Sequence, residues 1–190
     1  MKEYKREYPL FSLCGLNCGL CPRYQSEGTS KCPGCGGKDF HLQHPSCAVI
    51  TCSKKQGDIE YCFQCKNYQC NRYKSPSEKD SFITYRNVIS DMRKAMDHGI
   101  EQYQAELNEK ISFLEYLIRN YNDGRRKSFY CTSVNLLDLA DLYDIKERIQ
   151  KLDETIARKE KIKIIELWFE EKAKSKNIDL KLKKMNLNCQ

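Results

Sequence analysis

Proline is absent after residue 76, and only two of the nine glycines, Gly99 and Gly124, lie beyond Gly57. Helix interiors avoid both residue types, whereas tight turns need them. Their absence argues against a loop-rich second half and predicts a helical one, with the boundary near residues 74–77. We therefore expect a cysteine-rich module over residues 1–75, a helical region over residues 76–172, and a basic, flexible tail over residues 173–190.

Long apolar runs are also missing. No stretch of 18 apolar residues could span a bilayer, and residues 1–7 are rich in charge where a secretory signal would be apolar. These absences predict a cytoplasmic protein without a membrane partner. Because the cytosol is reducing, the 12 cysteines of the protein are expected to bind metal or to act in catalysis rather than to form disulfides.

Histidine is scarce, with three residues in the chain. His98 lies at an expected helix end, where capping explains it, and no pair of nucleophile and base can be identified. Enzymatic activity is therefore the less favoured interpretation. Its support is the cysteine triplet at residues 14, 18 and 21, considered below, and the basic loop Arg125–Lys127 near Cys131, which could bind an anion or activate that thiol.

The formal charge of +7 suggests an anionic partner, but metal binding would change the balance. Residues 1–75 contain 11 Lys or Arg and 6 Asp or Glu, and each zinc ion held by four thiolates subtracts two charges. Two or three such sites would cancel the excess. Basic character is thus weak evidence for nucleic-acid binding.

Apolar periodicity predicts the helices of the second half. Apolar residues recur at spacings of three and four and would therefore share one face of a helix that ends at His98–Gly99. They are Phe82, Tyr85, Ile89, Met92 and Met96. A second helix from Ile100 to Asn122 has Tyr103, Leu107, Ile111, Leu114, Ile118 and Tyr121 on its apolar face. The short connection predicts a helical hairpin.

Residues 125–131 are expected to form a basic and aromatic connector before a third helix over residues 136–156. Beyond Arg158 the pattern either extends that helix or begins another. The expected fold class is therefore a small, metal-stabilised, loop-rich module of the zinc-ribbon or knuckle type, followed by an all-α hairpin or bundle.

Ten cysteines fall between residues 14 and 70, and their spacings are those of metal ligands. They are Cys14, Cys18, Cys21, Cys32, Cys35, Cys47, Cys52, Cys62, Cys65 and Cys70. A CxxC turn directs two thiolates to one ion, and two such turns complete a tetrahedral zinc site. In Cys32-Pro33-Gly34-Cys35-Gly36, proline fixes the entry of the turn and glycine permits positive φ after the second ligand. We expect two or three zinc ions.

The ligand pairing stays open. Cys62 and Cys65 are the natural partners of Cys32 and Cys35, although the intervening 26 residues exceed the usual span of about 15 to 20. His41 and His44 would raise the donor count to that of three four-coordinate sites, but solvated loop histidines are the commoner case. Cys131 is expected to be a small buried residue, with ligand or nucleophile as alternatives, and Cys189 an exposed thiol.

The triplet Cys14-x3-Cys18-x2-Cys21 is similar to the iron-sulfur motif of radical S-adenosylmethionine enzymes, in which three thiolates hold a [4Fe-4S] cluster. Those enzymes require a large barrel of strand and helix repeats. The surrounding sequence predicts cysteine loops and helices instead. An iron-sulfur enzyme, radical or redox, is therefore the alternative to structural zinc.

Several stretches together resemble a family of cysteine-rich bacterial proteins, domain-of-unknown-function family 3795. They are Cys14 to Pro22, Cys32 to Cys35, Cys47 to Cys70, and Asn122 to Cys131 followed by Asn135 to Leu137. The resemblance implies metal, most plausibly zinc, at the ten cysteines, and it implies no substrate.

The favoured function is a zinc-binding module that presents a surface to a protein or nucleic-acid partner, of unknown oligomeric state. A loop-rich segment of this length buries too little apolar surface to fold alone, so metal must supply folding energy. Basic residues interleave with Tyr61, Phe63, Tyr68 and Tyr73, which could stack on single-stranded nucleic acid. The simpler interpretation is that these aromatic side chains cover the metal sites.

Overall fold

The computed structural model describes residues 4–44, 46–73 and 80–183. Within these ranges it contains α-helices and short 3-10 helices and no β-strand. The first part holds α1 (Phe40–Gln43), α2 (Ala48–Lys55) and the 3-10 turns η1 (Cys18–Leu20), η2 (Gly28–Ser30), η3 (Cys62–Gln64) and η4 (Asn71–Tyr73). The second part holds α3 (Val88–Asp97), α4 (Ile100–Tyr121), α5 (Lys127–Leu136), α6 (Leu139–Gln150) and α7 (Arg158–Ser175). This confirms the expected helical second half.

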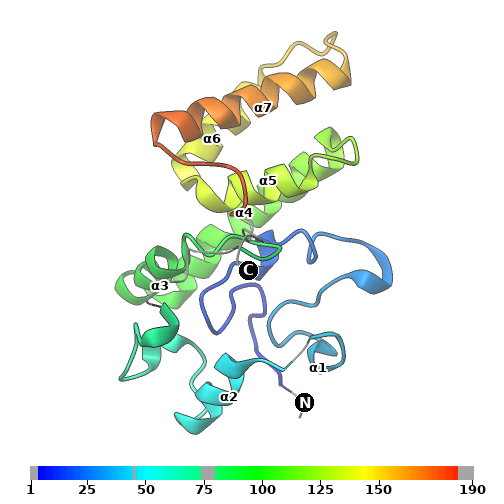
Figure 1. Ribbon diagram of the computed structural model, residues 1–190. Helices are drawn as coiled ribbons and strands as arrows, with labels where there is room; N and C mark the ends of the chain where they lie inside the picture. Colours follow the sequence, from blue (N-terminus) through cyan, green and yellow to red (C-terminus); the bar gives the residue numbers. More distant parts are fainter. Residues whose placement is uncertain (1–3, 45, 74–79, 184–190) are drawn as a thin grey trace, which may run out of the picture.

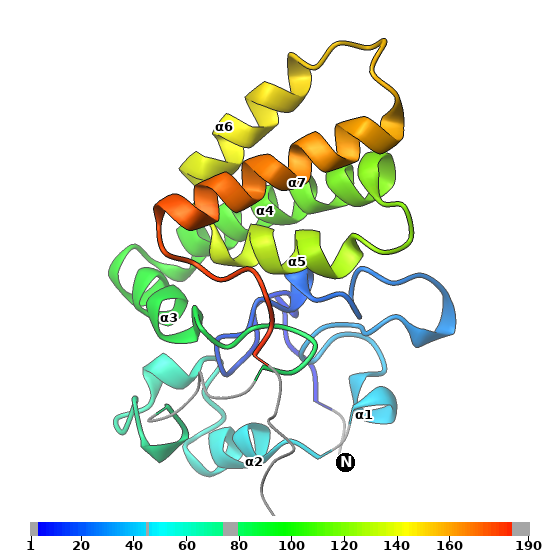
Figure 2. The same cartoon turned by 45° about the horizontal axis from the view of Figure 1, so that its top comes forward.

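Helix α4 is the central element. It packs against α3, α5, α6 and α7, and α6 and α7 also pack on each other. Figures 1 and 2 show α6 and α7 at one end of the molecule, with α1, α2 and the loops of the first part at the other. The cysteine-rich loops therefore lie beneath a helical layer that α4 supports.

Helix α3 is shorter than the apolar pattern predicts, and the face that it buries differs from the predicted face. Its buried residues are Val88, Asp91, Met92 and Ala95, whereas Phe82 lies before the helix and is 59% exposed. The pattern was misleading because residues 80–87 form a loop, which Asp80 closes by accepting a hydrogen bond from the backbone N–H of Tyr85 at 2.9 Å.

Helix α4 follows the predicted bounds and buries Tyr103, Leu107, Ile111 and Leu114 of the expected face. The expected connector over residues 125–131 is wrong from Lys127 onward, because α5 begins there. The single helix expected over residues 136–156 is divided, with extended backbone at Leu137 and Asp138 before α6. Helix α7 is a separate element that begins at Arg158.

The main hydrophobic core draws on both parts of the chain. Phe11, Leu20 and Tyr61 from the cysteine-rich part are buried in the same cluster as residues of α3 to α7. The rings of Phe11 and Tyr103 lie 4.6 Å apart between centroids. A smaller cluster of Tyr4, Leu13, Phe40 and Ile50 packs against the cysteine loops. The boundary predicted near residue 75 lies outside the described residues.

A buried polar network also joins the two parts. The Asn17 amide donates to Asp91 Oδ2 and to Asn135 Oδ1, each at 2.9 Å, and its Oδ1 accepts from the Tyr103 hydroxyl at 2.9 Å. Asn17 lies between two of the candidate ligands, Cys14 and Cys18. The first cysteine loop is thus fixed to three helices through one side chain.

Residues 178–183, part of the predicted flexible tail, lie along the loop before α3. Arg86 donates from its guanidinium to the carbonyls of Asp179 and Lys181, and the backbone N–H of Asp80 donates to the Lys183 carbonyl at 3.0 Å. Ile178 and Leu180 pack against the main core. Among the described residues, no helix is both long and apolar enough to cross a membrane.

Candidate metal centre

The ten predicted ligands line two neighbouring cavities. Cys52, Cys62, Cys65 and Cys70 line the smaller one, and Cys14, Cys18, Cys21, Cys32, Cys35 and Cys47 line the larger one. Val49, Arg72 and Tyr73 contribute to both. The two groups of thiols therefore lie side by side, divided by a shared wall.

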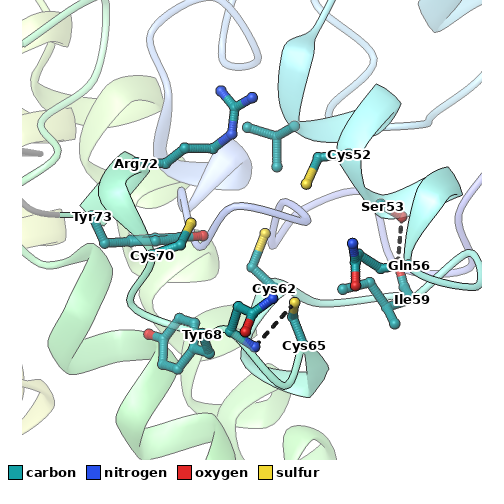
Figure 3. Close-up of a pocket in the computed structure, with 12 residues that line it drawn as sticks. Cys52, Ser53, Gln56, Ile59, Cys62, Cys65, Tyr68, Cys70, Arg72 and Tyr73 are labelled. Carbon is teal, nitrogen blue, oxygen red and sulfur yellow. Dashed lines mark hydrogen bonds between the residues drawn. The ribbon is translucent and has the colours of Figure 1, made fainter.

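The smaller cavity has a volume of about 30 Å³, close to the space of a single water molecule. Cys52 comes from α2, Cys62 begins η3, Cys65 follows it, and Cys70 precedes η4. Figure 3 shows their sulfurs gathered around Cys62. This arrangement offers four thiols to one small occupant.

The larger cavity has a volume of about 670 Å³ and is built from loops. Cys14, Cys18 and Cys21 stand at and beside η1, Cys32 and Cys35 on the following loop, and Cys47 directly before α2. The backbone N–H of Cys32 donates to the Arg23 carbonyl at 2.9 Å, which holds the Cys32 loop against the end of the first one. Arg23 and Arg72 also line this cavity.

Backbone N–H groups donate to the sulfurs of several of these cysteines, and at Cys14 and Cys21 these bonds favour thiolate. The N–H of Asn67 donates to Cys65 Sγ at 3.4 Å. Leu16 and Arg23 make the corresponding backbone bond to Cys14 and Cys21, two residues back, and each bond lowers the pKa of its thiol. Donors that point at a sulfur stabilise its charged form, which is what a metal ligand must become.

Burial acts in the opposite direction and is the larger effect. It raises the pKa of Cys18 well above its ordinary value, with the Cys35, Cys14 and Cys21 thiols adding to the shift. It also raises the pKa of Cys35 and of Cys62 to about 11. Without a cation these thiols are neutral at pH 7, so a metal ion would have to displace their protons.

The glycines of the Cys32–Cys35 turn have the predicted conformation. Gly34 and Gly36 have φ of +82° and +75°. A Cβ at Gly34 would come within 2.6 Å of the Pro9 carbonyl oxygen. The turn therefore has no room for a larger residue, and the expectation of positive φ after the second ligand is confirmed.

Within residues 4–44, 46–73 and 80–183, no three Cys, His, Asp or Glu side chains are close enough as they stand to hold one metal ion. The residues present nevertheless fit thiophilic metals, because the donors are all cysteine and several accept N–H bonds. A cysteine side chain has one rotatable bond, so small rotations change the direction of its sulfur. The ligand assignment stays a prediction.

The sequence suggests that Cys32 and Cys35 share an ion with Cys62 and Cys65, but the two pairs line different cavities. The Cys32–Cys35 pair lines the larger cavity and the Cys62–Cys65 pair the smaller, because the N-terminal loop lies between them. The backbone N–H of Cys62 donates to the Leu13 carbonyl at 2.9 Å. Two CxxC pairs separated by such a long insertion are not constrained by sequence to meet.

The histidines differ in position. His44 lines the larger cavity, and its ring stacks on Phe40 with centroids 4.6 Å apart. His41, one turn earlier on α1, lines neither cavity.

Cys131 is buried in α5, as predicted, and burial raises its pKa to about 12. Cys189 lies outside the described residues.

Sequence reasoning missed Arg6. Its side chain is fully buried and donates to the Phe11 carbonyl at 2.6 Å and to Glu60 Oε1 at 2.8 Å. It also hydrogen-bonds to the Cys35 sulfur and lowers the pKa of that thiol. Nothing in the charged stretch around Arg6 distinguishes it from its neighbours, so only the packed structure reveals the contact.

Fold and site together define a helical protein with a cysteine-rich, loop-built N-terminal segment. Residues 10–75 match a family model described as "Protein of unknown function (DUF3795)", and the matched segment, which contains all ten cysteines, is similar to that family. No curated protein and no solved structure matches the chain.

Proposed function

We propose that the cysteine-rich segment binds zinc and acts as a structural binding module rather than as a catalyst. The observation that carries this proposal is the convergence of all ten predicted ligands on two adjacent cavities. Zinc prefers thiolate donors in four-coordinate sites, and such sites contribute folding energy to loops with little core of their own.

The packing of the loops supports a structural role for the metal. Within residues 4–44 and 46–73, one small cluster of buried apolar residues exists besides the contacts with the main core. Neutral thiols are small and add little packing of their own, whereas metal–thiolate bonds, formed when a cation displaces the thiol protons, would link separate loops directly. Metal at both cavities would tie the η1 loop, the Cys32–Cys35 turn and α2 to one another.

Elemental analysis of the purified full-length protein tests the proposal. We expect zinc, no iron, and loss of loop structure when a chelator is added. The variant Cys65→Ala should lower the zinc content, whereas the matched variant Cys131→Ala, which removes a cysteine outside both cavities, should not. The proposal would be contradicted by a protein that contains no metal and whose circular dichroism and stability do not change when a chelator is added.

The alternative is an iron-sulfur protein built on Cys14, Cys18 and Cys21, which share the larger cavity. The same analysis distinguishes it, because anaerobic purification would then give a brown protein containing iron and acid-labile sulfide. Donor chemistry alone does not separate the two metals, since thiolates suit both.

A protein partner is favoured over nucleic acid. Tyr61 and Tyr73 are buried, and the Tyr73 hydroxyl donates to the Cys14 carbonyl at 3.2 Å. Tyr61 stacks on Phe63 with ring centroids 5.3 Å apart. These aromatic side chains are engaged in packing and so are poorly placed to stack on bases. Salt-dependent binding in a filter assay with single-stranded nucleic acid would reverse this preference.

A further inference from the structure

The larger cavity presents more thiols than one zinc ion can use. Six cysteines line it, whereas a tetrahedral ion takes four ligands. A single ion would leave two buried thiols without a role. Two separate ions would need eight donors, and adding His44 supplies only a seventh. Two ions can be satisfied by six thiolates only when some of the sulfurs bridge both ions.

The electrostatic contacts among the six thiols form two ends and a middle, and Cys14 also interacts with Cys62 of the smaller cavity. At one end, Cys21 lies close enough to Cys32 for their charges to interact, and the Cys32 N–H bond to Arg23 fixes this neighbourhood at 2.9 Å. At the other end, Cys14 interacts in the same way with Cys47. The two ends draw on different parts of the chain.

The middle of the cavity belongs to Cys18 and Cys35. Cys18 interacts with Cys35, with Cys14 at one end and with Cys21 at the other, and it receives a backbone hydrogen bond from Cys35. Cys35 also interacts with Cys14. Cys18 therefore neighbours both terminal pairs, as a bridging ligand must, whereas Cys35 neighbours Cys14 and is joined to Cys32 through the CxxC turn.

We propose that the larger cavity holds a two-metal cluster in which Cys18 and Cys35 bridge the ions, Cys21 and Cys32 complete one ion, and Cys14 and Cys47 complete the other. The smaller cavity then holds a single ion on Cys52, Cys62, Cys65 and Cys70. This inference rests on the proposed function, and it fixes both the stoichiometry and the ligand pairing.

The charge around the cavity suits such a cluster. Two divalent ions with six thiolates carry a net charge of −2, and Arg23 and Arg72 line the cavity. Arg6, whose side chain is buried, hydrogen-bonds to the proposed bridging sulfur of Cys35. A buried guanidinium beside a shared thiolate offsets the charge that burial would otherwise penalise.

Cadmium-113 NMR of the full-length protein tests the proposal, with the metal content measured on the same sample. Zinc ions joined by one sulfur lie within about 4.6 Å of each other, twice a zinc–sulfur bond of about 2.3 Å. After substitution, only cadmium ions that share a ligand show scalar coupling through it. We expect three cadmium ions per chain, with two coupled resonances and one uncoupled resonance.

Matched variants assign the resonances. Cys52→Ala should remove the uncoupled resonance and leave the coupled pair, whereas Cys47→Ala should perturb only the coupled pair. His44→Ala should leave all three resonances. If either cysteine variant fails to fold, the spectrum of the unaltered protein still decides the question.

Three uncoupled resonances, or two ions per chain, would overturn the two-metal cluster while leaving the proposed metal-binding function intact. A chain that takes up no cadmium or zinc would instead overturn the proposed function itself. Loss of a resonance in His44→Ala would show that imidazole, rather than a second bridging thiolate, completes the site.

Discussion

Asp91 is a buried carboxylate at the centre of the contact between the first cysteine loop and the helices. Its side chain is hydrogen-bonded to Asn17, and the buried amine of Lys110, which donates to the Leu137 carbonyl at 2.8 Å, interacts with it electrostatically. Burial raises the pKa of Asp91 to about 6, although Lys110 and the bond from Asn17 act to lower it. The folded protein therefore binds this proton more tightly than the unfolded chain.

We predict that Asp91→Asn changes the pH dependence of stability. The contribution of Asp91 is full below about pH 4, the range of its unfolded pKa, and is lost as the pH rises through about 6. The variant cannot ionise, so its free energy of unfolding should rise relative to the unaltered protein by up to about 3 kcal/mol across that interval. Urea denaturation at a series of pH values measures the difference, and metal loss affects both proteins alike. Parallel curves would show that Asp91 does not titrate there.

At the residue scale, the sequence predicted the glycine conformation after Cys35 and the burial of Cys131, whereas the role of the ten cysteines as ligands stays a prediction. It did not predict Arg6 or Asn17, because a single buried polar side chain leaves no periodic pattern. Their partners, Cys35 and Asp91, lie far along the chain. Spacing rules describe local turns and cannot report contacts between distant segments.

At the scale of elements, η1 packs more extensively on α4 than on any other helix. Gly19 in η1 faces Ile111 in α4, and a Cβ at this position would lie 2.2 Å from Ile111 Cδ1. The backbone N–H of Gly19 donates to the Leu10 carbonyl at 3.0 Å, so the turn cannot simply move away. The first cysteine loop therefore packs on α4 at a position where any larger side chain must displace Ile111.

We predict that Gly19→Ala destabilises the protein by about 1 to 3 kcal/mol, the usual range for overpacking. The clash with Cδ1 is the proposed cause, so the cost should be smaller in an Ile111→Val background, which lacks that atom. Thermal denaturation of the four proteins of this double-mutant cycle measures the coupling. Equal costs in both backgrounds would place the effect in the turn itself rather than in its contact with α4.

The helices show where local patterns succeed and fail. Helix α4 was predicted well because its length repeats the apolar spacing several times. Helix α3 was not, since Phe82 and Met96 have helical spacing yet are 59% and 49% exposed. In α3 the polar residue Asp91 is buried instead, and Asn135 of α5 is also buried. Both accept hydrogen bonds from the Asn17 amide, and a hydrophobic pattern cannot predict such compensation.

At the scale of the whole molecule, the shared core makes the cysteine-rich and helical parts dependent on each other. Phe11, Leu20 and Tyr61 belong to the cluster that also contains Ile165 and Phe169 of α7. The division into units at residues 1–75 and 76–172 followed from glycine and proline content, which reports local backbone needs and not where apolar surface is buried. Whether these units unfold separately is open to direct measurement.

We predict a single unfolding transition for both parts. Trp168, the one tryptophan of the chain, lies in α7 and packs against the main core, so its fluorescence reports the helical part. In the cobalt-substituted protein, thiolate-to-metal absorption reports the cysteine-rich part. The two signals should change at the same denaturant concentration, because loss of Phe11, Leu20 and Tyr61 from the core destabilises the helices as well. Chelation should then lower the midpoint of the Trp168 signal, although no predicted ligand lies in α7. Two separated midpoints, with chelation leaving the midpoint of the Trp168 signal unchanged, would instead establish the cysteine-rich segment as an independent domain.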